Sequence, residues 1–285
     1  MKMKTIAVLS GILSLSAVSV ASAADMAVKA PVVPPAPIFT WTGFYIGADV
    51  GWAGSRQTAT TVGTPAGFGA PAIVGAGIAG IGVLPMSHGL SDDSVMGSIH
   101  AGYNWQAGAW VLGLEGDVSV IDRNASSSQP VLLSFAVPPQ NAGPFLVSAH
   151  NDWLATVRGR IGYAWDKLML YGTGGAAFTR TSYNTAYTSV GVAPAIGPLV
   201  ANFSSDKVGF AVGGGAEWAV SPNWLLRAEY LYYRFDGAQS SMAVVAGSCV
   251  AATGCAFVTN TGDLEFHTAR VGLSYKFGGP VVARY

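Results

Sequence analysis

Residues 266–277 read FHTARVGLSYKF, and this stretch decides the fold. Counted with a period of two, one face carries His267, Ala269, Val271, Leu273, Tyr275 and Phe277. The opposite face carries Phe266, Thr268, Arg270, Gly272, Ser274 and Lys276. Apart from the first residue of each face, one is apolar and the other polar or small, which indicates a strand and not a helix. A soluble strand hides its apolar face, whereas a membrane strand turns it to lipid and turns charge toward a lumen.

The composition of the chain supports a membrane strand. Only 11% of the 285 residues are charged, against roughly 25% in typical globular proteins, and the mean hydropathy is +0.40. Beyond the first 25 residues there is no run of 18 apolar residues that could form a spanning helix. Such a chain either buries much of itself in a core or crosses the bilayer as strands. The formal net charge of zero provides no basic field for nucleic acid.

Segment boundaries follow from shifts in composition. Residues 1–23 have the pattern of a secretory signal peptide: a basic start, an apolar run over 6–20 and Ala21-Ser22-Ala23 as the cleavage site. Residues 24–40 are rich in Pro and Ala and predict an extended periplasmic tether. We expect the barrel to occupy 41–277 and a C-terminal extension to occupy 278–285.

Eight alternating segments of about ten residues follow the tether, a length that suits a tilted strand crossing a bilayer. They lie at 43–52, 94–105, 110–120, 152–163, 168–178, 208–220, 223–235 and 266–277. Short turns are expected at 106–108, 165–167 and 221–223, and long loops at 53–93, 122–151, 179–207 and 236–263. Short turns at one end and long external loops at the other are typical of membrane barrels. The sequence therefore predicts an all-β protein, an eight-stranded antiparallel up-and-down transmembrane β-barrel with both termini on the periplasmic side.

The tryptophans support the same topology. Six of the eight lie at or near strand ends on the short-turn side, and Trp52 and Trp153 lie at strand ends on the long-loop side. The six are Trp41, Trp105, Trp110, Trp165, Trp218 and Trp224. A soluble core would place Trp in the middle of elements, whereas interfacial girdles place it at both ends.

Several motifs resemble a known family. The stretches 41–47 (WTGFYIG), 101–106 (AGYNWQ), 112–117 (LGLEGD) and 158–163 (RGRIGY) are similar to the small, outer-membrane protein A-like, porin-family β-barrels of alphaproteobacteria. The resemblance covers about residues 39–277. It implies a Gram-negative outer-membrane location in contact with lipid and lipopolysaccharide, and an envelope-integrity or surface-antigen role. In some family members it also implies pore formation or haemin binding.

The end of the chain resembles the C-terminal signal that the outer-membrane barrel-assembly machinery reads. Its pattern of a polar residue, a glycine and two aromatics is met by Arg270, Gly272, Tyr275 and Phe277. The chain departs from the family by running on to Tyr285. Either Phe277 or Tyr285 could therefore be the aromatic that ends the signal.

Nine charged residues are predicted to face the lumen. They are Asp49, Glu115, Asp117, Glu217 and Glu229, with Arg158, Arg160, Arg227 and Arg270. They could form an ion path, or a plug of salt bridges in a barrel whose interior side chains just fill it. We favour the plug, because buried charges persist only when paired and hydrogen-bonded. On this hypothesis Glu115→Ala leaves an arginine unpaired and costs several kcal/mol.

Other chemistry has weaker signals. Glu115 and Asp117 have the spacing of an acid and a base, but no nucleophile motif surrounds any of the four histidines. No His or Cys spacing fits zinc, so we predict no catalytic, cofactor or metal site and no enzyme activity. Cys249 and Cys255 are the two cysteines, and in an exported chain their spacing predicts a disulfide within the last long loop.

The sequence favours a structural envelope component with surface-exposed loops. The alternatives are a small porin-like channel for ions or solutes, and binding of a ligand such as haemin or of a host surface through the loops. Residues 57–91 contain no Asp, Glu, Lys or Arg, which is consistent with packing of this loop on the barrel mouth, lipopolysaccharide or a partner, or with a flexible Gly-rich segment. A soluble ligand-binding barrel is the remaining alternative. The sequence gives no indication of oligomeric state.

Overall fold

The computed structural model describes residues 39–63, 85–133, 140–188, 199–243 and 256–278, all within the unit Pro37–Tyr285. The described residues contain no helix long and apolar enough to cross a membrane. Their strands are β1 (Gly43–Gly63), β2 (Met86–Ala107), β3 (Trp110–Leu133), β4 (Gln140–Trp165), β5 (Leu168–Tyr187), β6 (Leu199–Ala219), β7 (Trp224–Phe235), β8 (Ala238–Ala243) and β9 (Ala256–Lys276).

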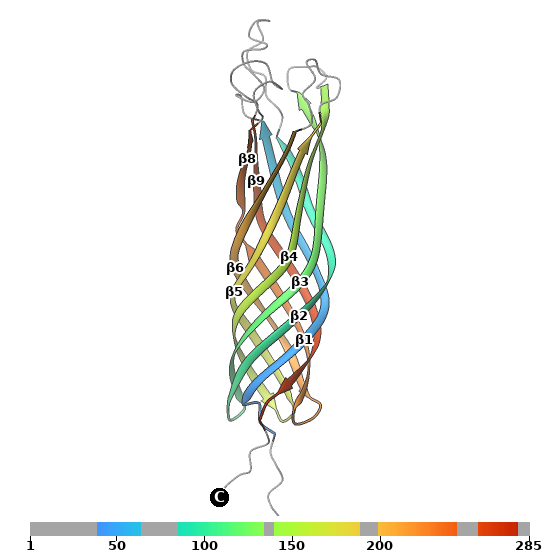
Figure 1. Cartoon of the computed structure of the whole chain (residues 1–285). Helices are drawn as coiled ribbons and strands as arrows, with labels where there is room; N and C mark the ends of the chain where they lie inside the picture. Colours follow the sequence, from blue (N-terminus) through green and yellow to red (C-terminus); the bar gives the residue numbers. More distant parts are fainter. Residues whose placement is uncertain (1–38, 64–84, 134–139, 189–198, 244–255, 279–285) are drawn as a thin grey trace, which may run out of the picture. The chain divides into compact units, whose positions relative to one another are not determined.

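The strands form a closed antiparallel ring. Each strand from β1 to β7 pairs with the next, β7 pairs with β9, and β9 pairs with β1 to close the sheet (Figure 1). β7 pairs with the second half of β9 and β8 with its first half, so β7 and β8 share one position in the wall and are interrupted at Asp236-Gly237. The wall therefore has eight positions, which confirms the predicted eight-stranded antiparallel barrel.

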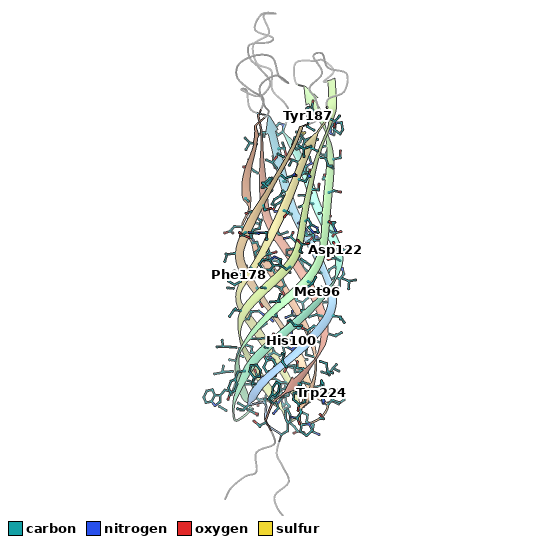
Figure 2. The ribbon with its side chains drawn as sticks, in the orientation of Figure 1. Met96, His100, Asp122, Phe178, Tyr187 and Trp224 are labelled. Carbon is teal, nitrogen blue, oxygen red and sulfur yellow. The ribbon has the colours of Figure 1, made fainter. Side chains whose placement is uncertain are left out.

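An apolar belt surrounds the end of the barrel that carries the short turns. Large hydrophobic side chains stand exposed there on every wall position, among them Ile99 on β2, Leu114 on β3, Val157 on β4 and Val271 on β9. Seven of the eight tryptophans face outward at the edges of this belt, as Trp224 does in Figure 2. Trp41 is the exception, because it is fully buried inside the barrel. Its predicted place in the girdle is wrong.

The hairpins of the short-turn end have the expected positions. β2 and β3 are joined by Gly108-Ala109, and β4 and β5 by Asp166-Lys167. Gly108 has φ +63° and Asp166 has φ 51°, both in the left-handed region that two-residue hairpin turns require. Residues 220–223 form the third short connection.

The predicted long loops are wrong over most of their length, because the strands continue beyond the belt. On β5 the outward residues change from Leu170 and Phe178 to Arg180, Ser182 and Asn184 without a break in the alternation. Outward polar residues lack the apolar pattern of a lipid-facing strand, so the sequence pattern predicts a loop for this part of the strand. Strands of 20 to 26 residues thus replace the expected ten at most wall positions.

Beyond the belt the wall divides into two sheets (Figure 1). The β2–β3 ladder ends at Met96 and Ile121, and the β6–β7 ladder ends at Gly209 and Phe235. Past these points the described strands run as one sheet of β8, β9, β1 and β2 and another of β3, β4, β5 and β6. We call these sheet I and sheet II. A hydrophobic core lies between them, with Ala59, Met86 and Leu90 from sheet I and Ala125, Val131, Phe145, Val147, Ala149, Tyr183 and Tyr187 from sheet II.

Candidate functional site

The structure places all nine predicted lumen residues inside the barrel, at the level of the apolar belt. They are Asp49 on β1, Glu115 and Asp117 on β3, Arg158 and Arg160 on β4, Glu217 on β6, Arg227 and Glu229 on β7, and Arg270 on β9. Each stands on the face opposite the exposed hydrophobic residues, because successive side chains alternate across a strand. No residue of the set has more than 5% of its surface exposed.

Asp49 is held by a two-pronged contact from Arg227. Arg227 Nε donates to Asp49 Oδ1 at 2.7 Å and its Nη2 to Oδ2 at 3.1 Å. This fork geometry is the one that a planar guanidinium offers a carboxylate. Ser98 Oγ also donates to Asp49 Oδ2 at 3.0 Å, and His100 Nδ1 lies 2.9 Å from the same oxygen. His100 then reaches β9, where its Nε2 is 2.7 Å from Ser274 Oγ.

Glu115 is the most shared carboxylate of the network. Arg158 Nη2 donates to its Oε1 at 2.7 Å, and Arg227 Nη1 and Arg160 Nη1 donate to its Oε2 at 2.9 and 3.3 Å. The Tyr45 hydroxyl donates to Oε2 at 2.8 Å. Glu115 therefore joins side chains from four strands, β1, β3, β4 and β7.

Asp117 and Glu229 form the second layer, around Arg270. Arg270 Nη1 donates to Asp117 Oδ1 at 2.8 Å, and its Nε donates to Glu229 Oε2 at 2.8 Å. Arg158 contacts both carboxylates, at 3.3 Å to Asp117 and 3.2 Å to Glu229. The Tyr171 hydroxyl donates to Glu229 Oε1 at 3.0 Å. Each arginine of the network thus bridges strands on different sides of the barrel.

Glu217 has the simplest environment of the five carboxylates. Arg160 Nη2 donates to its Oε1 at 2.6 Å, while its Oε2 has no partner among the described residues. The Arg160 guanidinium also lies 3.9 Å from the centre of the Tyr171 ring, within cation–π range. These contacts carry the network toward the short-turn end.

The side chains of the charged layer are almost completely enclosed. The nine side chains are each 2% exposed or less to a water-sized sphere. A water-filled channel would expose the charged side chains that line it. Five carboxylates and four guanidinium groups leave the layer with one formal negative charge, and His100 lies against Asp49. The geometry is that of a plug held by salt bridges.

The short-turn end is closed by a second, apolar layer. Trp41 packs there with Val111, Met169 and Leu225, among other buried residues. Its indole Nε1 donates to the carbonyl oxygen of Asp166 at 3.1 Å, and its backbone nitrogen donates to Gln106 Oε1 at 2.8 Å. The residue that precedes β1 therefore fills the mouth of the barrel on this side.

Some interior residues were missed by the sequence reasoning. Strand alternation places Tyr45 on the same face as Asp49, which the structure confirms, but its contact with Glu115 was not predicted. Arg123 could not be found, because its position fell in a predicted loop. It is 1% exposed just beyond the belt, and among the described residues its guanidinium donates to Ser55 Oγ, Asn151 Oδ1 and the Leu90 carbonyl. Burial lowers the pKa of Arg123 to about 10.

The remaining predicted site residues are not tested by the geometry. Tyr275 and Phe277 face outward and Arg270 inward at the end of β9, and their role as an assembly signal stays a prediction. Cys249, Cys255 and the signal peptide 1–23 lie outside the described residues, so the disulfide and export also stay predictions. Within the described ranges, no group of three or more His, Cys, Asp or Glu could hold a metal ion.

Comparison with known proteins identifies the family. A family model described as the outer membrane protein beta-barrel domain matches residues 10–277. The chain belongs to this outer-membrane barrel family. It is 31% identical over 277 residues to the 31 kDa outer-membrane immunogenic protein of Brucella melitensis, which covers 95% of this chain and 98% of the relative. It is 30% identical to the 22 kDa outer membrane protein of Rhizobium leguminosarum over 48% of this chain and 50% of the relative.

Solved structures of outer-membrane barrels align at low identity. The outer membrane protease OmpT of Escherichia coli aligns over 85% of this chain and 99% of its own, with 12% identity and a TM-score of 0.47. That likeness carries no conclusion about activity. Membership of the outer-membrane barrel family confirms the predicted location, the outer membrane of a Gram-negative cell. The apolar belt is therefore the lipid-facing surface of this family member.

Proposed function

We propose that this outer-membrane barrel is a closed, non-conducting envelope component that holds a rigid two-sheet extension at the cell surface. The observation that carries the proposal is the burial of the lumen charges. Asp49, Glu229, Arg227 and Arg270 have side chains with no exposed surface, although a conducting pore needs its charged lining to be wet.

The closed interior also explains how the barrel supports its extension. Arginines from β4, β7 and β9 contact carboxylates from β1, β3, β6 and β7, so the network ties the strand positions together inside the belt. The same strands continue past the belt for nine residues on β5, about 30 Å along the strand. A rigid base thereby fixes the spacing of sheets I and II.

The extension has its own core and therefore its own stability. Leu90, Phe145 and Val147 are completely buried between the two sheets. Gln57 Nε2 on β1 donates to the Tyr183 hydroxyl on β5 at 2.9 Å, which links sheet I to sheet II. The Brucella relative is named an immunogenic outer-membrane protein, which supports exposure of this part of the barrel to the outside.

Conductance tests the closed state. We expect the folded protein to give no reproducible current steps in planar lipid bilayers, under conditions in which a known trimeric porin gives them. Reproducible steps from the wild-type protein would instead establish the porin-like channel. Within the loop predicted at 57–91 to bind haemin or a host surface, residues 64–84 lie outside the described residues.

Labelling with a membrane-impermeant maleimide tests surface display. Ser126→Cys places a thiol on the outer face of sheet II, and Asp166→Cys places one in a short turn. On intact cells we expect label on the first variant only, and on both after permeabilisation. The wild-type chain reports any background from Cys249 and Cys255. Label on Asp166→Cys alone in intact cells would reverse the orientation and end the surface role.

A further inference from the structure

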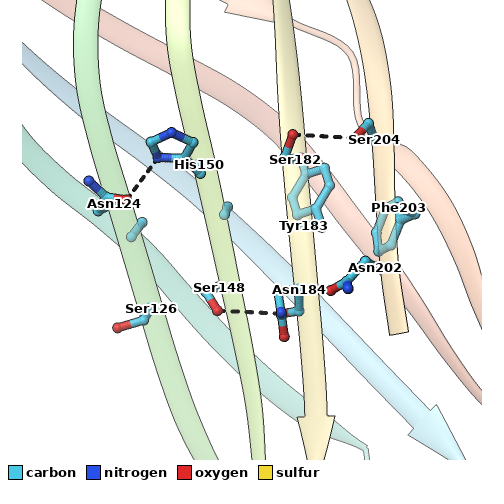
Figure 3. Close-up of a pocket in the computed structure, with 12 residues that line it drawn as sticks. Asn124, Ser126, Ser148, His150, Ser182, Tyr183, Asn184, Asn202, Phe203 and Ser204 are labelled. Carbon is cyan, nitrogen blue, oxygen red and sulfur yellow. Dashed lines mark hydrogen bonds between the residues drawn. The ribbon is translucent and has the colours of Figure 1, made fainter. Parts of the chain in front are cut away.

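The outer face of sheet II carries two continuous rows of uncharged polar side chains. One row is Asn124, His150, Ser182 and Ser204, and the other is Ser126, Ser148, Asn184 and Asn202. Within each row the residues are direct cross-strand partners on β3, β4, β5 and β6. We call these eight residues the polar grid (Figure 3). All eight line one hollow of about 750 Å³, a volume within the range of small-molecule sites.

Much of the hydrogen-bonding capacity of the polar grid is unused. Asn124 Oδ1 is 2.8 Å from His150 Nδ1, and the hydroxyls of Ser182 and Ser204 are 3.3 Å apart (Figure 3). The side chains of Ser126, Asn184 and Asn202 make no hydrogen bond within the described part of the chain. Hydroxyl and carboxamide groups both donate and accept, so they suit a ligand rich in hydroxyl groups.

The charges below the polar grid restrict the ligand further. The row between the belt and the grid consists of Asp122, Asp152, Arg180 and Asp206, three acids and one base. Arg180 is paired with Asp206 at 2.6 Å, and Asp152 lies 2.5 Å from His150 Nε2. An acidic border beside an uncharged surface disfavours an anionic ligand and leaves a neutral one. A neutral, hydroxyl-rich molecule of this size is an oligosaccharide.

The position of the polar grid indicates where such a sugar comes from. On β5, Ser182 and Asn184 follow the last lipid-facing residue, Phe178, by four and six residues. That is about 13 and 20 Å along the strand. The grid is thus continuous with the lipid-facing belt and lies where the sugar chain of an outer-leaflet glycolipid projects.

We infer that the polar grid binds the neutral sugar chain of the glycolipid in the outer leaflet. The imidazole of His150 is the one outward ring in these two rows and is already held by Asn124 and Asp152, so hydrogen bonds are the main contacts that hold the sugar. Such a site binds a free sugar in solution with low affinity. A glycolipid anchored beside the belt is present at high effective concentration, which compensates for weak contacts. The inference rests on the proposed orientation, which the maleimide labelling tests separately.

Three variants test the site. The grid variant combines Ser126→Ala, Asn184→Ala and Asn202→Ala, one residue each on β3, β5 and β6. The matched control combines Thr58→Ala, Ser87→Ala and Asn260→Ala, three exposed polar residues on β1, β2 and β9 of sheet I. A single variant, Asn184→Lys, leaves the fold of the strand intact and adds a charge at the centre of the grid. Resistance of each folded barrel to unfolding in detergent without boiling verifies folding.

Native mass spectrometry then counts the glycolipids held by each folded barrel, in a volatile buffer with a low concentration of Mg²⁺. The probes are lipopolysaccharide with its core sugars, lipid A without them, and the free core oligosaccharide. We expect lipopolysaccharide to be retained at least threefold more than lipid A by the wild-type protein and the control. The grid variant and Asn184→Lys should lose that difference and keep their lipid A binding. Equal retention of both lipids by the wild type, an unaffected grid variant, or equally strong binding of the free oligosaccharide would overturn the inference.

Discussion

Arg227 is the side chain whose loss should destabilise the barrel most. It donates four hydrogen bonds to three carboxylates: two to Asp49, one to Glu115 and one to Glu229. Glu115 and Glu229 each keep two other arginines when Arg227 is removed. Within the described ranges, the side-chain partners that Asp49 keeps are Ser98 and His100. Arg227→Met retains most of the side-chain volume, so the effect comes from the charge rather than from a cavity.

The expected magnitude follows from comparison with Glu115→Gln. Arg227→Met leaves five carboxylates against three arginines, and breaking a buried pair in this way costs about 3–5 kcal/mol. Glu115→Gln gives four carboxylates and four arginines, and Arg158, Arg160 and Arg227 each keep another carboxylate. Its cost should be that of weakened hydrogen bonds to a charged group, about 1–2 kcal/mol. The sequence-based expectation that loss of Glu115 leaves an arginine unpaired is therefore wrong.

Denaturant unfolding in lipid vesicles, followed by tryptophan fluorescence, measures both variants against the wild type. Asp93→Asn, at an exposed position, is the control and should stay within about 0.5 kcal/mol of wild type. A larger cost for Glu115→Gln than for Arg227→Met would refute the reasoning from charge balance. If neither variant changed the free energy of unfolding, the network would not stabilise the barrel at all.

Three further outcomes are expected. Burial lowers the pKa of His88, so below about pH 6.5 the unfolded state binds more protons than the folded state and stability falls with pH. Protease resistance of the two-sheet extension should therefore fall from pH 7 to pH 5 in the wild type but not in His88→Phe. Gly272→Ala should block refolding from urea into detergent, because a Cβ at this position overlaps the Asp49 carboxylate. Gly97→Ala has open space around it and should refold normally, and the mobility of unboiled samples on a gel measures the folded fraction of both variants. Trp41→Ala should lower unfolding stability by about 3–5 kcal/mol, measured by denaturant titration, and the lipid-facing Trp218→Ala by less.

Strand alternation at the belt was sufficient to predict much of this molecule. In segment 152–163, Val157 and Ile161 fall on one face and Arg158 and Arg160 on the other, and the structure exposes the first pair and buries the second. The signal is strong there because lipid accepts only apolar side chains while the lumen must pair its charges. The short turns were equally readable, because they interrupt the alternation with residues such as Gly108 that tolerate a positive φ.

The same reasoning failed beyond the belt, for a physical reason. Water replaces lipid there, so the outward residues become polar and the inward residues become the apolar ones. On β4 a bulge between His150 and Leu154 also shifts the phase, so that Val147 points inward although Val157, an even number of residues away, points to lipid. A search for outward apolar residues finds neither feature. The partners of Arg123 and the buried position of His88 depend on this part of the strands, so the search for outward apolar residues does not predict them.

The division of the wall into two sheets connects the lumen network to the surface. Within the belt every strand has two hydrogen-bonded neighbours, whereas past Met96 and Gly209 the described strands β2 and β6 keep only one. Edge strands left in this way are open to slippage or association unless something fixes them. Here the shared core and the salt-bridged base fix them, because Arg158, Arg227 and Arg270 each contact a carboxylate across the two groups of strands that separate above: Arg158 on β4 contacts Glu229 on β7, while Arg227 on β7 and Arg270 on β9 contact Glu115 and Asp117 on β3. A loosened lumen should therefore be felt first in the extension, as altered spacing between sheets I and II.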